Sequence, residues 1–591
     1  MRGILSIKNT NYTNLTVDID GRKESVSVDT KLHHVFHGDI VNVENGVITD
    51  IYHKKSIYRT SLLAGILDIT SIRKYGFNKR GTPIYYWKPF NKEIPPFYVS
   101  SNIRKKMKEP YSNVYCIIRY NEWTRDRPSG NCVRILGSVH DDSATILYLQ
   151  YCYNLYKKIY NIPRGVLIED NHRLIEGLPI CEEIIFSIDP KGTRDIDDAL
   201  SISEITPNNF KIGIYIADPG HIIDYMEGLG CDGLYNSICE KGLTLYTSMG
   251  NFPMMPEIVS TNLASLLPHK KRPSLSIHFN IDKRGNVISD ITFEHSVIQN
   301  TRAYTYEEVD RIVEKGKVNK GVYKLYKLSQ VIANTHTPKL YDTEWNSHKM
   351  VEALMVFANK SVARILYDRI PDKVITRSHS GFNRNISNVP KHLSKRVEIM
   401  NTTAAKYTRV QGYHHGLGIS FYTHFTSPIR RIVDLYTHYL IKELFFRCKM
   451  PSRIGEIAHD LDNVNNRVRM SKRYHFVLNK LDLYKKICDL PDGYDNVLGY
   501  IVDMEDNVIS IYVEKYDMVF RHHIIHRDMT KLYIFALDYD HKGNIFRQRI
   551  HRETGEGDEI IYTLYESYPM RLFAVNADCL RDRIRVELIR D

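Results

Sequence analysis

Four aspartates fall within ten residues of one segment, SIDPKGTRDIDDAL at 187–200. They are Asp189, Asp195, Asp197 and Asp198. Like charges this close repel one another unless a cation or the positive groups of a ligand compensate them. Magnesium takes carboxylate oxygens as ligands and completes its shell with waters and substrate phosphates. The segment therefore predicts a Mg²⁺ site, with Mn²⁺ as a substitute ion.

Two other interpretations of this segment can be tested against the spacing of its residues and the sequence on either side of it. An EF-hand loop beginning at Asp195 would need an oxygen ligand at Ala199 and a glycine at Leu200, so the sequence excludes it. A solvated acidic surface loop stays open, although the apolar runs IIFSI and ALSI on either side argue against it. The upstream strand and the Pro-Lys-Gly turn would bring Asp189 to the later aspartates from two sides of a loop.

A second segment, 414–440, reads HHGLGISFYTHFTSPIRRIVDLYTHYL. Ser-Pro-Ile-Arg-Arg before an amphipathic run predicts the start of a helix. Thr426 or Ser427 would cap this helix, and Pro428 would lie in its first turn.

Two adjacent arginines, Arg430 and Arg431, stand at that predicted helix start. Guanidinium groups at a helix N-terminus form a natural clamp for phosphate. Alternatively, Arg431 pairs with Asp434 on one helical face, which is a common and weak interaction. Both interpretations can hold, with Arg430 on a substrate phosphate and Arg431 structural.

Five regions must position these segments. Short strand-like pieces separated by turn residues predict two small OB-type barrels, at 1–57 and 58–165. Strand-like runs that alternate with long helical ones predict a mixed α/β domain at 170–448, which holds both segments. A helical connector is expected at 449–490 and a third OB-type barrel at 491–591. The expected fold class is multidomain α+β.

Composition indicates the kind of partner. The chain has 591 residues and a formal charge of +12, which favours a polyanion, nucleic acid before membrane. Basic clusters in the second predicted barrel suit single-strand binding, although such barrels also serve as protein adaptors. The 41 tyrosines suit base stacking, and AT-rich coding bias would explain them as well.

The cellular setting can also be inferred. Nine scattered cysteines without CxxC spacing argue against a zinc ribbon and suggest a reducing compartment. The N-terminus lacks the apolar run of a signal peptide, and no run reaches the ~20 residues that span a bilayer. We therefore expect a soluble intracellular protein without a membrane partner, cytoplasmic first, with the nucleus and organelles left open.

Both chemistry-bearing segments resemble the RNase II / RNase R family of exoribonucleases, the RNB family. Further similarities follow in the family's order, and 121–141 resembles the second cold-shock barrel of the eukaryotic exosome's catalytic subunit. The resemblance covers nearly the whole chain. Its motifs include HGDIVNV near 37, IADPGH at 216–221, KGLTLYTSMGNFPMMPEIVSTNLASLLP at 241–268, AYTYEEV at 303–309 and MVEALMVFAN at 350–359.

The resemblance implies two cold-shock OB barrels, an RNB catalytic domain and a C-terminal OB barrel. It implies that Asp189 and Asp198 hold magnesium, and that Asp195 supports the metal site. Asp197 matches the aspartate whose loss removes catalysis while RNA still binds. Arg430 matches the arginine that holds the scissile phosphate.

Further residues are carried over as RNA contacts. Tyr306 would stack near the terminal bases, Tyr246 would define the end of the channel, and Glu352 would contact the 3′-terminal ribose, with Arg431 beside the phosphate. Two departures affect the 3′ end: Ala353 stands where the family has a second glutamate, and the aromatic clamp residue expected within 331–349 cannot be assigned, with Tyr341 and Trp345 as candidates.

The implied activity is processive hydrolytic 3′-to-5′ degradation of single-stranded RNA to 5′-nucleoside monophosphates. An RNA-binding regulator on a catalytically inactive RNB scaffold is the alternative, although such proteins are expected to lose carboxylates. A DNA-directed nuclease would share the metal chemistry without explaining the motifs. We expect a monomer, with accessory partners unidentified and no second, endonuclease activity.

Overall fold

The computed structural model covers the whole chain in two compact units, 1–156 with 470–591, and 157–469. Each unit is described by itself. The residues that the structure describes are 1–29, 34–71, 75–106, 112–158, 160–166, 172–316, 320–337, 344–381, 389–505, 508–523, 533–540, 545–552 and 557–589.

The first unit begins with a five-stranded antiparallel sheet in the order β3-β2-β1-β4-β5. Its edges approach each other, because Ser27, just after β3, bridges to Val47 of β5. Alternate residues such as Leu5 and Ile7 are buried, as expected for strands with one face on a core. The strands are β1 Arg2–Ile7, β2 Leu15–Ile19, β3 Arg22–Val26, β4 Ile40–Glu44 and β5 Val47–His53.

Five more strands form a closed barrel in the order β10-β8-β7-β6-β9. They are β6 Leu62–Asp68, β7 Ile84–Pro89, β8 Phe97–Ser100, β9 Val114–Glu122 and β10 Ser129–Ser138. This region was expected to be mostly strand, and it ends in a helix that was not predicted, α1 at Asp142–Cys152. Asp141 caps this helix by accepting a hydrogen bond from the N–H of Ala144.

The C-terminal strands of this unit follow the long helix α10, Leu461–Cys488. They form half of a barrel, a five-stranded antiparallel sheet in the order β22-β21-β20-β26-β27, and a separate three-stranded sheet. The strands are β20 Tyr494–Glu505, β21 Val508–Val513, β22 Met518–His523, β23 Tyr533–Asp540, β24 Ile545–Arg552, β25 Gly557–Thr563, β26 Ser567–Ala574 and β27 Ile584–Leu588. The fold class is thus confirmed: OB-type β-sheets flank a mixed α/β domain.

The second unit is built around another closed barrel, in the order β11-β12-β13-β16-β17. β11 closes it by running parallel to β17, whereas the other neighbours are antiparallel. A hairpin, β14 Leu245–Thr247 with β15 Gly250–Phe252, adds a small separate ribbon. The barrel strands are β11 Ile185–Asp189, β12 Asp198–Thr206, β13 Asn209–Ala217, β16 Lys271–Asp282 and β17 Thr292–Thr305.

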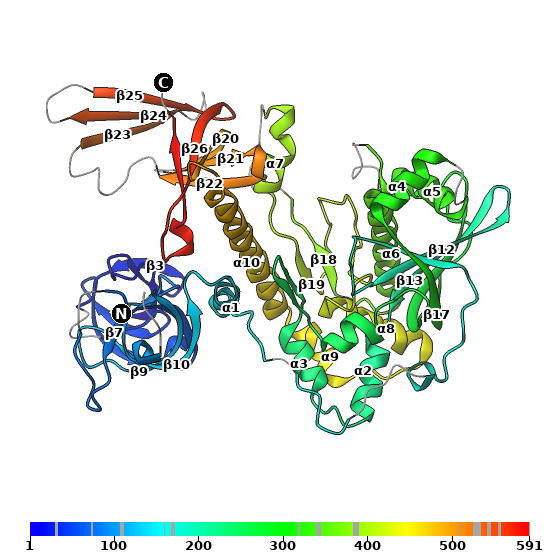
Figure 1. Ribbon diagram of the computed structural model, residues 1–591, viewed down its shortest axis with the longest axis horizontal. Helices are drawn as coiled ribbons and strands as arrows, with labels where there is room; N and C mark the ends of the chain where they lie inside the picture. The colour runs from blue at the N-terminus through cyan, green and yellow to red at the C-terminus, as the bar shows by residue number, and fades with distance from the viewer. Residues whose placement is uncertain are drawn as a thin grey trace. The chain divides into compact units, whose positions relative to one another are not determined.

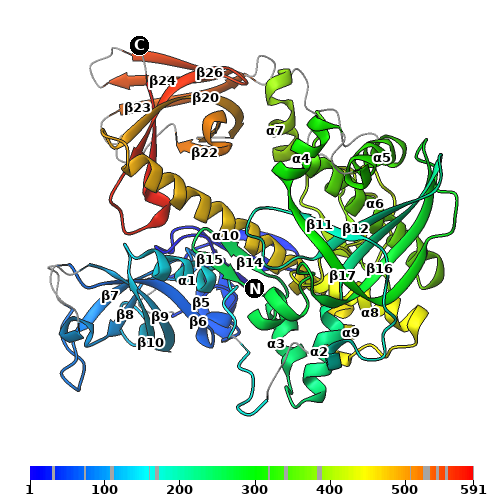
Figure 2. The ribbon, with the colours of Figure 1, turned by 45° about the vertical axis from the view of Figure 1, so that its right-hand side comes forward.

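Helices surround this barrel, with α4, α5 and α6 on one side and α2, α3, α8 and α9 on another (Figures 1 and 2). Their apolar residues join the strands in one large core. No helix among the described residues is long and apolar enough to cross a membrane. The bounds are α2 Pro219–Gly228, α3 Leu234–Lys241, α4 Tyr306–Lys315, α5 Lys320–His336, α6 Ser347–Arg369, α7 Lys391–Asn401, α8 Ile432–Phe446 and α9 Ser452–Gly455.

The helix after the Ser-Pro-Ile-Arg-Arg run begins later than expected. Arg431 is extended (φ −136°, ψ 126°) and bridges to Leu243, so α8 starts at Ile432 without a side-chain cap. Ser427 instead donates its N–H to Asp434 Oδ1 at 2.8 Å. The helix is buried on all sides over its first eleven residues, so its expected amphipathic pattern is also wrong.

Candidate active site

The acidic segment crosses from β11 to β12 at one end of the barrel. These two strands pair through Phe186 and Leu200 and then diverge, which places Asp189 at the end of one and Asp198 at the start of the other. Between them Ile196 is buried and donates its N–H to Ser265 Oγ at 2.9 Å. The loop is therefore anchored in the core, and its carboxylates face a cavity at this end of the barrel.

Asp189 and Asp198 are held in an environment that disfavours their charge. Burial raises the pKa of Asp189 to about 7, and the nearby carboxylates of Asp197 and Asp195 raise it further than Arg430 lowers it. Burial, followed by Asp189 and Asp197, raises the pKa of Asp198 well above its usual range. Within the described structure, Asp189 Oδ2 is buried without a hydrogen-bond partner. An oxygen-seeking cation would relieve each of these costs.

Asp197 is buried and has an arginine for a partner. Its Oδ2 accepts a hydrogen bond from Arg430 Nε at 2.9 Å, and its Oδ1 accepts one from the N–H of Ile429 at 3.1 Å. Arg430 Nη2 also donates to Ser427 Oγ at 2.8 Å. Burial outweighs these favourable contacts and raises the pKa of Asp197 to about 6. Asp197 thus fixes the direction of the arginine.

The neighbouring Arg431 is committed elsewhere. Its Nη2 donates to Asp434 Oδ1 at 2.7 Å, and the Asp434 side chain is fully buried. The structural pairing anticipated for Arg431 is confirmed, and its role as an RNA contact stays a prediction. The side chain of Arg430, in contrast, is 43% exposed.

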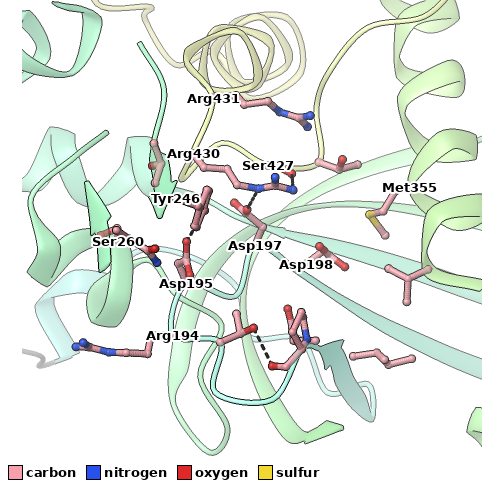
Figure 3. Close-up of a pocket in the computed structure, with 18 of the residues that line it drawn as sticks. Arg194, Asp195, Asp197, Asp198, Tyr246, Ser260, Met355, Ser427, Arg430 and Arg431 are labelled. Atoms are coloured by element: carbon pink, nitrogen blue, oxygen red, sulfur yellow. Dashed lines mark hydrogen bonds and ion pairs between the residues drawn. The ribbon is translucent and has the colours of Figure 1, made fainter. Parts of the chain in front are cut away.

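The four aspartates of the acidic segment, together with Arg430 and Arg431, line one cavity of about 1050 Å³. Asp195 and Asp198 lie on opposite sides of Asp197, and Arg430 lies over it (Figure 3). The cavity wall opposite the aspartates comes from one face of α6, where every third or fourth residue faces the opening. These residues are His348, Val351, Glu352, Met355, Val356 and Asn359.

Tyr246 and Tyr306, the two tyrosines expected to contact RNA, both line this cavity. Tyr246, on β14, donates its hydroxyl to Asp195 Oδ2 at 2.6 Å, the dashed contact in Figure 3. Tyr306, the first residue of α4, stacks on His348 with ring centroids 3.6 Å apart and planes 18° apart. Thr305 fixes the start of α4 through a capping box with Glu308. The cavity therefore has an aromatic surface beside its acidic floor.

Comparison with known proteins shows which proteins this chain resembles. Residues 180–447 match the RNB domain family. Residues 180–447 therefore form an RNB domain. It is 24% identical over 510 residues to the probable exosome complex exonuclease RRP44 of Caenorhabditis elegans, covering 70% of this chain and 51% of that protein. It is 27% identical over 323 residues to ribonuclease R of Chlamydia trachomatis, covering 44% and 45%. The chain spans about half the length of these relatives.

The similarity of fold extends beyond residues 180–447. The structure of Mycoplasma genitalium RNase R in complex with ribose-methylated single-stranded RNA matches with a TM-score of 0.72 at 17% identity, over 100% of both chains. Yeast Ssd1, a pseudonuclease, matches with a TM-score of 0.66 at 16% identity, over 94% of this chain and 81% of that one. These likenesses establish a shared fold.

The residues predicted from sequence to bind metal, catalyse or contact RNA all line this cavity: Asp189, Asp195, Asp197, Asp198, Tyr246, Tyr306, Glu352, Arg430 and Arg431. Glu352 lies on its α6 wall, and burial raises the pKa of its carboxyl group. His348 was missed, although it precedes Glu352 by one helical turn and so shares its face. Of the residues considered for the aromatic clamp, Tyr341 lies outside the described residues, and Trp345 packs against the core.

A second polar cluster lies in the RNB domain away from the cavity. Ligand atoms of Asp218, His221 and His295 lie within 4.8 Å of one another. Lys442 Nζ, however, donates to both carboxylate oxygens of Asp218, at 2.9 and 3.0 Å. Burial works to raise the pKa of Asp218, but Lys442 and His295 hold it well below its usual range. The lysine already neutralises this carboxylate, so we assign no metal here.

Proposed function

We propose that this protein is a processive, hydrolytic 3′-to-5′ exoribonuclease that degrades single-stranded RNA to 5′-nucleoside monophosphates. One observation carries the proposal: Asp189, Asp197, Asp198 and Arg430 converge at one cavity, where burial and neighbouring carboxylates outweigh the nearby positive charge and raise the pKa of Asp189 and Asp198. Phosphodiester hydrolysis needs an activated water and stabilisation of an anionic transition state. This set of side chains suits both needs.

The donor set fits magnesium, with manganese as a substitute. All candidate ligands are carboxylate oxygens, and the buried Asp189 Oδ2 has no hydrogen-bond partner in the described structure. Asp189 and Asp198 would hold the ion, and Asp195 would support the site from its hydrogen bond with Tyr246. When bound, the ion would supply Lewis-acid stabilisation and lower the pKa of a coordinated water.

The chain's own residues would position the scissile phosphate. Arg430 is oriented by Asp197 and Ser427 but stays partly exposed, so its guanidinium can donate to a phosphate oxygen. Because Asp197 already directs the arginine, little reorganisation is needed when RNA binds. This is electrostatic preorganisation, in which a fixed donor meets developing negative charge.

The opposite wall would recognise the 3′ nucleotide. The stacked rings of Tyr306 and His348 offer a surface on which a base can stack. Glu352 lies one turn further along α6 and can accept a hydrogen bond from a 2′-hydroxyl, the group that distinguishes RNA from DNA. Tyr246 would bound the cavity beside Asp195.

The relatives support the same reaction class. Those named above are an exonuclease and a ribonuclease, and the M. genitalium RNase R structure contains single-stranded RNA. A second candidate is an RNA-binding regulator without catalysis, because the pseudonuclease Ssd1 shares the fold. The four intact carboxylates favour the enzyme.

The deciding experiment follows RNA labelled at its 5′ or 3′ end, with Mg²⁺, for the wild type and Asp197→Asn. The proposal expects 3′ label released at once as a mononucleotide, while 5′-labelled RNA shortens progressively. Single-stranded DNA of the same sequence is the control and should survive. RNA that stays full length yet binds the wild-type protein would establish the second candidate instead.

A further inference from the structure

Asn359 lies on the cavity face of α6 and is 3% exposed. Its side-chain Oδ1 accepts a hydrogen bond from the N–H of Phe425 at 2.8 Å, and its Nδ2 donates to the Tyr422 hydroxyl at 3.2 Å. Nδ2 also makes a longer contact, 3.4 Å, with Thr426 Oγ1. An asparagine suits this position because an amide offers a donor and an acceptor at once. One side chain therefore ties α6 to residues 422–426.

Residues 422–426 lead directly to Arg430. Ser427 follows them, and its Oγ accepts a hydrogen bond from Arg430 Nη2 at 2.8 Å. Asp197 holds the same guanidinium through Nε, as Figure 3 shows. These contacts aim the arginine at the cavity, but a useful aim also requires that the backbone beneath it stays in place. The tie to Asn359 holds the backbone that leads into Ser427 and Arg430.

Phe425 is held through its N–H and through its carbonyl group. The N–H goes to Asn359 on α6, and the carbonyl oxygen accepts a hydrogen bond from Nε2 of His438, on α8, at 2.9 Å. Burial lowers the pKa of His438 to about 4, so the ring is neutral near pH 7 and Nε2 carries its one proton. The segment before Arg430 is therefore fixed between two helices by directional bonds.

The same helix carries the residue expected to contact the 3′-terminal ribose. Glu352 precedes Asn359 by seven residues, which is close to two turns and about 10 Å along a helix axis. Both residues line the cavity. Because a helix has a constant rise per residue, α6 fixes the spacing between Glu352 and the segment that leads to Arg430. Cleavage next to the terminal nucleotide requires this spacing to match the substrate.

We propose that Asn359 is a positioning residue for hydrolysis, which holds the Arg430 segment at a fixed distance from the α6 wall and acts through Arg430. This inference rests on the proposed function, because it concerns the same reaction. The competing explanation is that Asn359 stabilises the RNB domain without affecting where Arg430 meets a phosphate. The two explanations predict different couplings between Asn359 and Arg430.

A double-mutant cycle separates these explanations. Single-turnover release of the 3′ nucleotide is measured with Mg²⁺ for the wild type, Asn359→Ala, Arg430→Ala and the double variant. Asn359→Ala should slow release by about 10–100-fold, because a small misplacement of a reacting group is costly. In the Arg430→Ala background the same change should slow release by less than about threefold, since groups that act as one unit are not additive. Equal slowing in both backgrounds would overturn the proposal.

RNA affinity gives a second readout that a loss of fold would change. It is measured by fluorescence anisotropy in a chelator that prevents cleavage. Asn359→Ala should bind RNA as tightly as the wild type does, because Arg430 and the other cavity residues are retained. A fall in affinity that matches the fall in rate would contradict a positioning role.

Asn465→Ala is the matched control. Asn465, on α10, bonds the N–H and the carbonyl oxygen of Tyr407 at 2.7 and 2.8 Å and is not among the residues that line the cavity. This variant should lower the melting temperature and leave nucleotide release unchanged. If it slowed release as much as Asn359→Ala does, destabilisation alone would explain both variants and the proposal would fail.

Tyr422→Phe replaces Asn359→Ala in the cycle if that variant does not fold. It keeps the ring, removes the hydroxyl that accepts from Asn359, and should slow release by roughly 3–10-fold, the equivalent of one neutral hydrogen bond. Release as fast as in the wild type would count against the proposal. A wild type that releases no nucleotide would remove the exoribonuclease proposal and this inference together. An active wild type with equally active variants would remove this inference alone.

Discussion

Arg430 and Asp197, 233 residues apart in the chain, form an ion pair with Nε 2.9 Å from Oδ2. The adjacent Arg431 turns instead to Asp434, which is fully buried. One arginine is therefore poised at the cavity and the other supports the segment that carries it. Of these two consecutive residues, Arg430 is placed to bind a ligand and Arg431 stabilises the local structure.

Asp197→Asn should separate catalysis from binding. The amide removes the negative charge that orients Arg430, and losing a preorganised electrostatic group costs about 10²–10³-fold in rate. RNA affinity should stay equal or rise, because Arg430 is then free of its carboxylate. Mononucleotide release and anisotropy on the same preparation check this. A parallel loss of affinity and rate would contradict the assignment.

Replacing each arginine by lysine should give opposite outcomes. Arg430→Lys keeps the charge but loses the two-pronged donor geometry, so we expect about a 10²-fold slower release with little change in stability. Arg431→Lys weakens a charged hydrogen bond to buried Asp434 and should lower the free energy of unfolding by about 1.5–3 kcal/mol. Chemical denaturation and mononucleotide release should both be measured on both variants, so that each variant is the control for the other.

Tyr246→Phe tests the support of Asp195. It removes one hydroxyl, which donates to Asp195 Oδ2 at 2.6 Å, and keeps the ring. A hydrogen bond to a charged group contributes about 1.5–3 kcal/mol, so release should slow by roughly 10–100-fold if Asp195 supports the metal. Titration of Mg²⁺ against activity should show a higher requirement. An unchanged Mg²⁺ requirement would show that the hydroxyl has no part in holding the ion.

Magnesium affinity should depend on pH near neutrality. The pKa of Asp189 is raised to about 7, so its protonated form favours the folded state and that contribution is lost as pH rises through about 7. Mg²⁺ binds the ionised form, so its stabilising effect should be larger at about pH 8 than at about pH 6. Thermal unfolding with and without Mg²⁺, in the absence of RNA, measures this. Asp189→Asn is the control and should show little Mg²⁺-dependent shift at either pH.

Lys442→Met should destabilise the RNB domain without touching the cavity. It leaves the buried carboxylate of Asp218 without its cation, which costs about 3–5 kcal/mol for such a broken pair. Adding Asp218→Asn removes the uncompensated charge and should restore part of the stability. Denaturant titration of the single and double variants tests this. A double variant no more stable than the single one would argue against charge as the cause.

The spacing of apolar residues predicted the helices whose formation depends mainly on residues close together in the sequence. The long helical runs expected within 170–448 correspond to helices such as α6, Ser347–Arg369, and α8, Ile432–Phe446. The helix at 142–152 was missed, although Asp141 offered a capping signal.

Long-range contacts limited the prediction of the site. The aspartates and Arg430 could be identified from their spacing, but not the pairing of Arg430 with Asp197 or of Tyr246 with Asp195. Each joins segments that meet only after the barrel closes. The late start of α8 has the same origin, because the bridge from Arg431 to Leu243 holds the backbone extended where capping rules expect a helix.

The raised pKa values of Asp189 and Asp198 have an evolutionary consequence. At neutral pH each of these carboxyl groups must either take up a proton on folding or be buried with its charge, and both cost free energy, so replacing them with neutral residues should make the bare scaffold more stable. Most stabilising changes of this kind cost activity rather than structure. Substitutions that remove these carboxylates would then inactivate the domain and stabilise its fold at the same time. A protein under no selection to cleave RNA could lose catalysis in this way without compensating substitutions elsewhere.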